Sequence, residues 1–165
     1  MSKFLDFIIV SPNDVEQDYP SEHLTIIQQE DFSIKVERGK IYGFLSKYDM
    51  FASPTSLRQI NQVFIQYHQI AGAYTDQLIE KDEYTKRIYH PSNITNQMVN
   101  SPIFLSGEIQ PEFNNELKYL QCYDMIKELK DKVILCHIPK PLILSKVPVN
   151  SFTVQQDLYL IQQNQ

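Results

Sequence analysis

The stretch 57-LRQINQVFIQYHQIAGAYTDQL-78 carries the strictest periodic pattern in this 165-residue chain. Its apolar residues recur at alternating steps of three and four: Leu57, Ile60, Phe64, Tyr67, Ala71, Tyr74 and Leu78. This heptad spacing predicts one long amphipathic helix packed against a partner surface. The preceding Ser53-Pro54 pair favours a helix start, because serine can cap free N–H groups and proline fits the first turn. Gly72 interrupts the pattern, where glycine costs a helix about 1 kcal/mol relative to alanine, so three alternatives stay open at this position: a bend of the helix, its end, or the close approach of a neighbour.

The residues before this stretch predict strands. Residues 4–10 form a nearly continuous apolar run, which is typical of a buried strand, and residues 24–28 predict a second one. Residues 32–36 alternate apolar and polar side chains and are followed by Arg38-Gly39 and a further apolar run at 41–45. Alternation around a glycine-containing turn predicts a β-hairpin. We therefore expect an N-terminal antiparallel sheet.

The C-terminal half predicts a second long amphipathic helix and further strands. The helix is expected to begin near Pro111, and strands are expected at 103–105, 133–138 and, as an edge strand, 142–144. The segment 152–161 is compatible with either a strand or a helix. The predicted fold is α+β within a single globular domain, residues 1–165: an N-terminal antiparallel sheet with a hairpin, two long amphipathic helices and C-terminal strands.

Composition limits the classes of partner. Hydrophobic residues make up 42% of the chain and charged residues 21%, with a formal net charge of −5, as expected of a globular protein. A negative chain is a poor ligand for nucleic acid phosphates, and no apolar run is long enough to span a membrane. The two cysteines, Cys122 and Cys136, are too few for a disulfide framework and indicate a reducing, cytoplasmic compartment.

The sequence carries none of the short motifs that mark common chemistries. Phosphate loops, dinucleotide fingerprints, nucleophile elbows and zinc-binding motifs are all absent from it. Cys136 and His137 are adjacent in a predicted strand, so their side chains point to opposite faces and do not form a dyad. The sequence therefore predicts no cofactor, no metal, no catalytic residue and no enzymatic activity.

Acidic residues crowd one predicted loop near the N-terminus. Asp14, Glu16, Asp18 and Glu22 surround Tyr19 in this loop. Such a patch can steer a basic partner, and tyrosine is a frequent anchor at protein interfaces. In its bulk properties the chain resembles the small acidic immunity proteins that neutralise bacterial toxins, although no motif carries the resemblance. The first functional hypothesis is therefore a cytoplasmic inhibitor that binds another, basic protein through these five residues.

Two alternatives stay open at this stage. In the first, the chain is a non-catalytic subunit of a larger assembly, and the heptad stripe is its docking face or the seam of a homodimer. In the second, the chain is an enzyme whose site has no sequence motif. That site would contain a histidine beside a tyrosine or a carboxylate, with His68 and His137 as the candidates in a pocket.

Overall fold

The computed structural model describes residues 3–81, 84–95, 97–146 and 151–163 of the chain. In these residues the strands are β1 (Phe7–Ser11), β2 (Leu24–Gln28), β3 (Ile41–Phe44), β4 (Asp49–Phe51), β5 (Gly72–Lys81), β6 (Tyr84–Ile88), β7 (Ile103–Ser106) and β8 (Leu135–Lys146). The helices are α1 (Ser56–Gln66), α2 (Gln121–Leu129) and α3 (Ser151–Gln163), and a short 3-10 turn, η1, spans Ser21–His23. None of the described helices is both long and apolar enough to cross a membrane.

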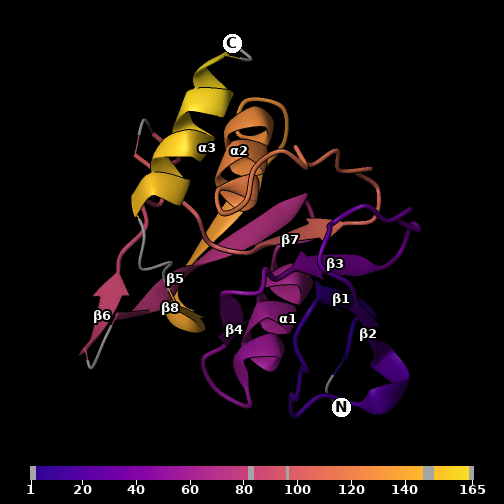
Figure 1. Cartoon of the computed structure of the whole chain (residues 1–165). Coiled ribbons are helices and arrows are strands. Elements are labelled where there is room, and N and C mark those ends of the chain that lie inside the picture. Colours follow the sequence, from indigo (N-terminus) through magenta and orange to yellow (C-terminus); the bar gives the residue numbers. More distant parts are fainter. Residues whose placement is uncertain (1–2, 82–83, 96, 147–150, 164–165) are drawn as a thin grey trace.

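The strands form one mixed sheet in the order β2-β1-β3-β7-β5-β8-β4, and β6 pairs with β5. β1 runs parallel to both β2 and β3, and β5 runs parallel to β8. β7 is antiparallel to its neighbours β3 and β5. Helix α1 lies on one side of the sheet, and α2 and α3 lie on the other (Figure 1). The fold is mixed α/β, so the expectation of an α+β fold with an N-terminal antiparallel sheet is wrong.

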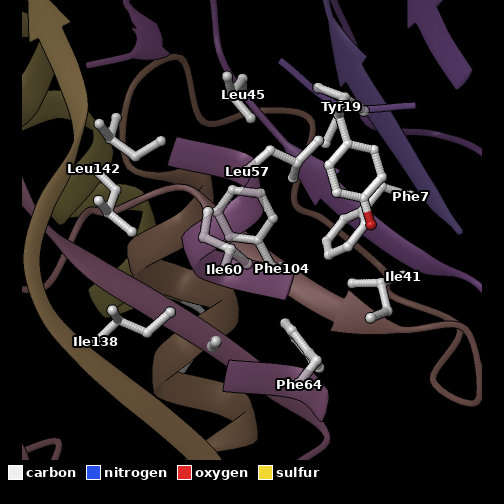
Figure 2. Packing of buried hydrophobic residues seen from close by; sticks show 13 residues of the cluster. Phe7, Tyr19, Ile41, Leu45, Leu57, Ile60, Phe64, Phe104, Ile138 and Leu142 are labelled. Atoms are coloured by element: carbon white, nitrogen blue, oxygen red, sulfur yellow. The ribbon is translucent and has the colours of Figure 1, made fainter. Parts of the chain in front are cut away.

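Two of the three hydrophobic clusters in the described residues lie on opposite faces of the sheet and explain the apolar run at residues 4–10. Side chains alternate along a strand, so Phe7 and Ile9 of β1 join the core beneath α1, whereas Ile8 and Val10 join the core beneath α2. A strand covered on both faces reads as a continuous apolar segment, which is typical of parallel sheets. Figure 2 shows the first core, in which side chains of α1 lie among those of several strands.

The predicted hairpin does not form, because residues 32–36 are not a strand. Instead, the Gln110 side chain accepts a hydrogen bond from the Val36 N–H at 3.2 Å and donates one to the Ile34 carbonyl at 2.9 Å. The Gln110 amide thus makes the hydrogen bonds with the backbone of residues 34 and 36 that a partner strand would otherwise make. The buried Phe32 ring packs edge-on against Phe44 of β3. β3 itself pairs in parallel with β1 and antiparallel with β7.

The long helix predicted over residues 57–78 is also wrong. Leu57, Ile60 and Phe64 are buried on α1, but the helix ends at Gln66, and β5 begins at Gly72. A Cβ atom at Gly72 would lie 2.9 Å from the Phe104 carbonyl oxygen of neighbouring β7, so the close approach of these strands requires glycine. The apolar spacing misleads here because a step of four residues keeps side chains on one face in strands as well as in helices.

The remaining elements are partly as predicted. β2 and β7 occupy the predicted positions, and α3 resolves the ambiguity at 152–161 in favour of a helix. The second helix begins at Gln121, well after Pro111. β8 continues through Pro139 and Pro141 and lies between β5 and β4, so it is not an edge strand. The register of β5 and β8 shifts on both sides of Asp76, which accommodates the missing proline N–H groups.

Candidate functional site

A pocket of about 340 Å³ lies at the carboxyl ends of the parallel strands β1, β2 and β3. The chain places β2 on one side of β1 and β3 on the other. Open α/β sheets bind ligands where the strand order reverses in this way, because the diverging connections leave a crevice. The pocket is lined by Pro12, Glu30, Asp31, Ser46, Lys47, Asn115, Leu117, Lys118 and Gln121.

The wall that follows β2 is acidic. Glu30 and Asp31 are exposed and follow closely after the last residue of β2. Asp31 Oδ1 accepts hydrogen bonds from the Ser33 N–H at 3.0 Å and from Gln29 Nε2 at 3.2 Å. This local turn fixes the carboxylate at the rim of the pocket. A carboxylate held there can accept further hydrogen bonds from hydroxyl groups of a ligand.

The wall that follows β3 combines a hydroxyl group and an ammonium group, from Ser46 and Lys47. Asp49 is 8% exposed, and its Oδ2 accepts hydrogen bonds from the Ser46 N–H at 3.1 Å and the Ser46 Oγ at 2.8 Å. Asp49 Oδ1 accepts a hydrogen bond of 2.6 Å from Ser145 Oγ of β8. Burial raises the pKa of the Asp49 carboxyl, against the effect of these serine hydrogen bonds. Asp49 therefore supports this wall from inside the protein.

The third wall, residues 115–121, is anchored by helix α3. Asp157 of α3 is buried, and its Oδ2 accepts hydrogen bonds from the backbone N–H groups of Lys118 at 3.1 Å, Tyr119 at 2.7 Å and Leu120 at 2.8 Å. Hydrogen bonds to an ionised acceptor are stronger than those between neutral groups. The C-terminal helix thereby holds the backbone that carries Lys118 at the pocket.

A second polar cluster is buried around Asp76 of β5, which is 1% exposed. Asp76 Oδ1 lies 2.7 Å from His137 Nε2 and accepts a hydrogen bond of 2.9 Å from the His90 N–H, while Oδ2 accepts one of 3.0 Å from Arg87. Burial alone would raise the pKa of Asp76, but the hydrogen bonds from His137, His90 and Arg87 outweigh it and lower the pKa. The cluster ties β5 to β6, to β8 and to the segment after β6.

This cluster contains the arrangement that the enzyme hypothesis required of a histidine. The His137 ring stacks on Tyr74 with centroids 5.2 Å apart and contacts the Asp76 carboxylate. Its polar partner, Asp76, is buried inside the protein. His68 is exposed in the segment after α1.

Burial raises the pKa of the Cys136 thiol, as expected of an unreactive cysteine.

The residues predicted to bind a partner protein lie between β1 and β2. Asp14 accepts a hydrogen bond of 2.6 Å from Gln28, and Asp18 forms an ion pair of 3.2 Å with Arg58 of α1. Glu16 and Glu22 are exposed.

Tyr19 differs from these carboxylates. It is 7% exposed, and its hydroxyl group donates a hydrogen bond of 2.6 Å to the Leu5 carbonyl. Tyr19 is therefore a core residue, and its assignment as a surface anchor is corrected. Inhibition of a basic partner through the four carboxylates stays a prediction.

The apolar stripe proposed as a docking face is divided between two elements. Its residues on α1, Leu57, Ile60 and Phe64, pack in the core beneath the sheet. Tyr67, which follows the helix, is 43% exposed. The face of α1 that the assembly hypothesis assigned to a partner is therefore covered by the chain's own strands.

Sequence reasoning missed the residues that line the pocket. Asp31 and Lys47 each follow an apolar run by a few positions, and this signal is visible in the sequence. This signal indicates a shared site only if the runs form parallel strands, because the carboxyl ends of parallel strands lie at the same edge of a sheet. The expected antiparallel hairpin would also bring residues 31 and 47 to its open end, but it contains no parallel strands and therefore predicts no switch point beside them.

The fold and the position of the pocket define an open α/β protein with a pocket at its topological switch point. No family model matches the chain, and no curated protein matches its sequence. Among solved structures, the chain is similar to the crystal structure of residues 1–349 of TarS from S. aureus, with a TM-score of 0.59 and 11% identity. The match covers 95% of this chain and 64% of that chain, so this chain spans less than two thirds of the neighbour's length.

Proposed function

We propose that the pocket at the ends of β1, β2 and β3 binds a nucleoside diphosphate sugar, as the donor site of a glycosyltransferase-type domain. The observation that carries this proposal is the composition of the pocket at the switch point of the sheet. One wall presents the carboxylates Glu30 and Asp31, and the others present the ammonium groups of Lys47 and Lys118. Carboxylates suit ribose hydroxyl groups, and ammonium groups suit phosphates.

Size and fold agree with this ligand class. The volume of about 340 Å³ falls within the range of small-molecule sites, roughly 300–1,000 Å³. TarS, the structural neighbour, is a glycosyltransferase. At this low identity the likeness concerns the fold alone, and the proposal of an enzymatic function rests on the pocket.

Nucleotide titration tests the proposal. Isothermal titration calorimetry with UDP, GDP and ADP should detect saturable binding of at least one of them. The Lys47→Gln variant should bind it about tenfold more weakly, because one charge-assisted phosphate contact is lost. The Lys130→Gln variant is the matched control, since Lys130 lines a different pocket, beside Ile94 and Tyr123. Binding that is absent, or equal in both variants, would contradict the proposal.

A second measurement separates binding from transfer. The chain is incubated with UDP-glucose, UDP-N-acetylglucosamine and GDP-mannose, and the release of UDP or GDP is followed by chromatography. Release that disappears in the Asp31→Asn variant would support an enzyme acting from this pocket. Binding without release would support a nucleotide-sugar binding domain and would count against catalysis by this chain.

A further inference from the structure

The carboxylates around the pocket form a poor cation site, because they lie on one wall only. Magnesium and related cations bind through several oxygen ligands with defined geometry. In the pocket lining, Glu30 and Asp31 are the carboxylates, and both belong to the connection after β2. Asp31 Oδ1 is already engaged by Ser33 and Gln29. Within the described residues, no group of three or more histidine, cysteine, aspartate or glutamate side chains is arranged to hold a metal ion.

The wall that follows β3 offers no carboxylate to complete a cation site. Asp49 is the first carboxylate after β3, but it does not line the pocket. Both of its oxygens accept hydrogen bonds from serines inside the protein, from Ser46 and Ser145. Its high pKa, caused first by burial, also disfavours the ionised form that a cation requires.

Two cationic side chains line the same pocket. Lys47 lies in the β3 wall, and its carbonyl accepts a hydrogen bond of 3.1 Å from Asn13 Nδ2, which fixes the backbone at this position. Lys118 lies in the third wall, and its N–H donates to the buried Asp157. Both side chains are exposed and line the same pocket. These anchors fix the backbone of the two residues in separate segments, and the Lys47 ammonium group lies over the Tyr48 ring, 5.4 Å from its centroid.

We infer that Lys47 and Lys118 neutralise the diphosphate of the ligand directly, so that nucleotide binding requires no divalent cation. This inference rests on the proposed function, because it concerns how the same pocket recognises the same ligand. A divalent cation would bring further positive charge to a wall that already carries an ammonium group. Like charges repel, which weakens a cation-mediated complex relative to the direct one.

The test is titration of the full chain with UDP, GDP and ADP in two buffers, one with excess EDTA and one with magnesium and manganese chloride. We expect the same dissociation constant in both buffers for any nucleotide that binds. Lys47→Gln and Lys118→Gln should each weaken binding about tenfold in EDTA, whereas Lys130→Gln should not. Thermal melting of each variant shows whether it is folded.

The outcomes separate this inference from the proposed function. Binding that appears only with magnesium or manganese would overturn the inference and leave the proposed function in place. Absence of binding in both buffers would overturn both. A Lys47→Asp variant sharpens the distinction, because it adds a carboxylate to the β3 wall. We expect this variant to lose binding in EDTA and to regain part of it with manganese; a variant that binds equally well in EDTA would contradict direct neutralisation by Lys47.

Discussion

A single buried carboxylate, Asp76, fixes several segments of the sheet. It lies where the register between β5 and β8 shifts, and there it meets side chains or N–H groups from β6, from β8 and from the segment that follows β6. A buried charge is tolerated only when it is paired and hydrogen-bonded, and Asp76 satisfies both conditions. The polar residues in the middle of β5 therefore stabilise the fold. The candidate site is formed instead by residues at the carboxyl ends of β1, β2 and β3.

Protonation of His90 should make stability depend on pH. His90 is buried with Nε2 2.8 Å from Gln77 Oε1, and burial lowers its pKa from 6.5 to about 4, against the attraction of Asp76. A lowered pKa means that the unfolded chain binds the proton first, so this contribution to stability is present above pH 6.5 and is lost as the pH falls to about 4. The urea concentration at the midpoint of unfolding should therefore fall as the pH is lowered from 6.5 to about 4. The His90→Gln variant should show a shallower fall, and an equal fall would exclude His90 as the cause.

At the scale of elements, the loop that follows β7 has no room for a side chain at Gly107. A Cβ atom at this position would lie 1.9 Å from the Glu37 carbonyl oxygen, which is backbone and cannot rotate away. We expect Gly107→Ala to reduce the free energy of unfolding by roughly 3 kcal/mol, measured by urea denaturation. Gly39→Ala is the matched control, because Gly39 has φ +86° but open space around its Cβ position. It should cost only about 1 kcal/mol, and equal losses would argue against the clash.

The same elements show how far the sequence predicts this fold. Local apolar runs located β2 and β7 correctly, because a buried strand needs little beyond its own side chains to be recognised. Strand direction and pairing depend on segments far apart in the chain, so Ile41–Phe44 was assigned to a hairpin when it pairs with β1 in parallel. Gly72 marks in the sequence a place where the predicted helix bends or ends or a neighbour approaches closely, but which of these holds, the close approach of β7, is decided only in three dimensions.

For the whole molecule, the candidate site depends on contacts that no local pattern specifies. Its lining comes from four separate regions of the chain, around residues 12, 30, 46 and 118, and the last is held by a helix at residues 151–163. The sequence contains no glycine-rich phosphate-binding motif. This absence does not exclude a pocket in which lysine side chains take over the role of backbone N–H groups.

Asp157 should couple the C-terminal helix to the pocket. Its carboxylate accepts hydrogen bonds from the N–H groups of three successive residues, including Lys118, so the Asp157→Ala variant leaves these buried and part-buried donors without their acceptor. We expect a loss of roughly 2–4 kcal/mol in the free energy of unfolding and weaker nucleotide binding. Calorimetry at a temperature well below the melting point separates the two effects. The Asp131→Ala variant, which removes an exposed carboxylate after α2, is the control and should change neither quantity. Unchanged nucleotide affinity in a folded but less stable Asp157→Ala variant would show that α3 stabilises the fold without shaping the site.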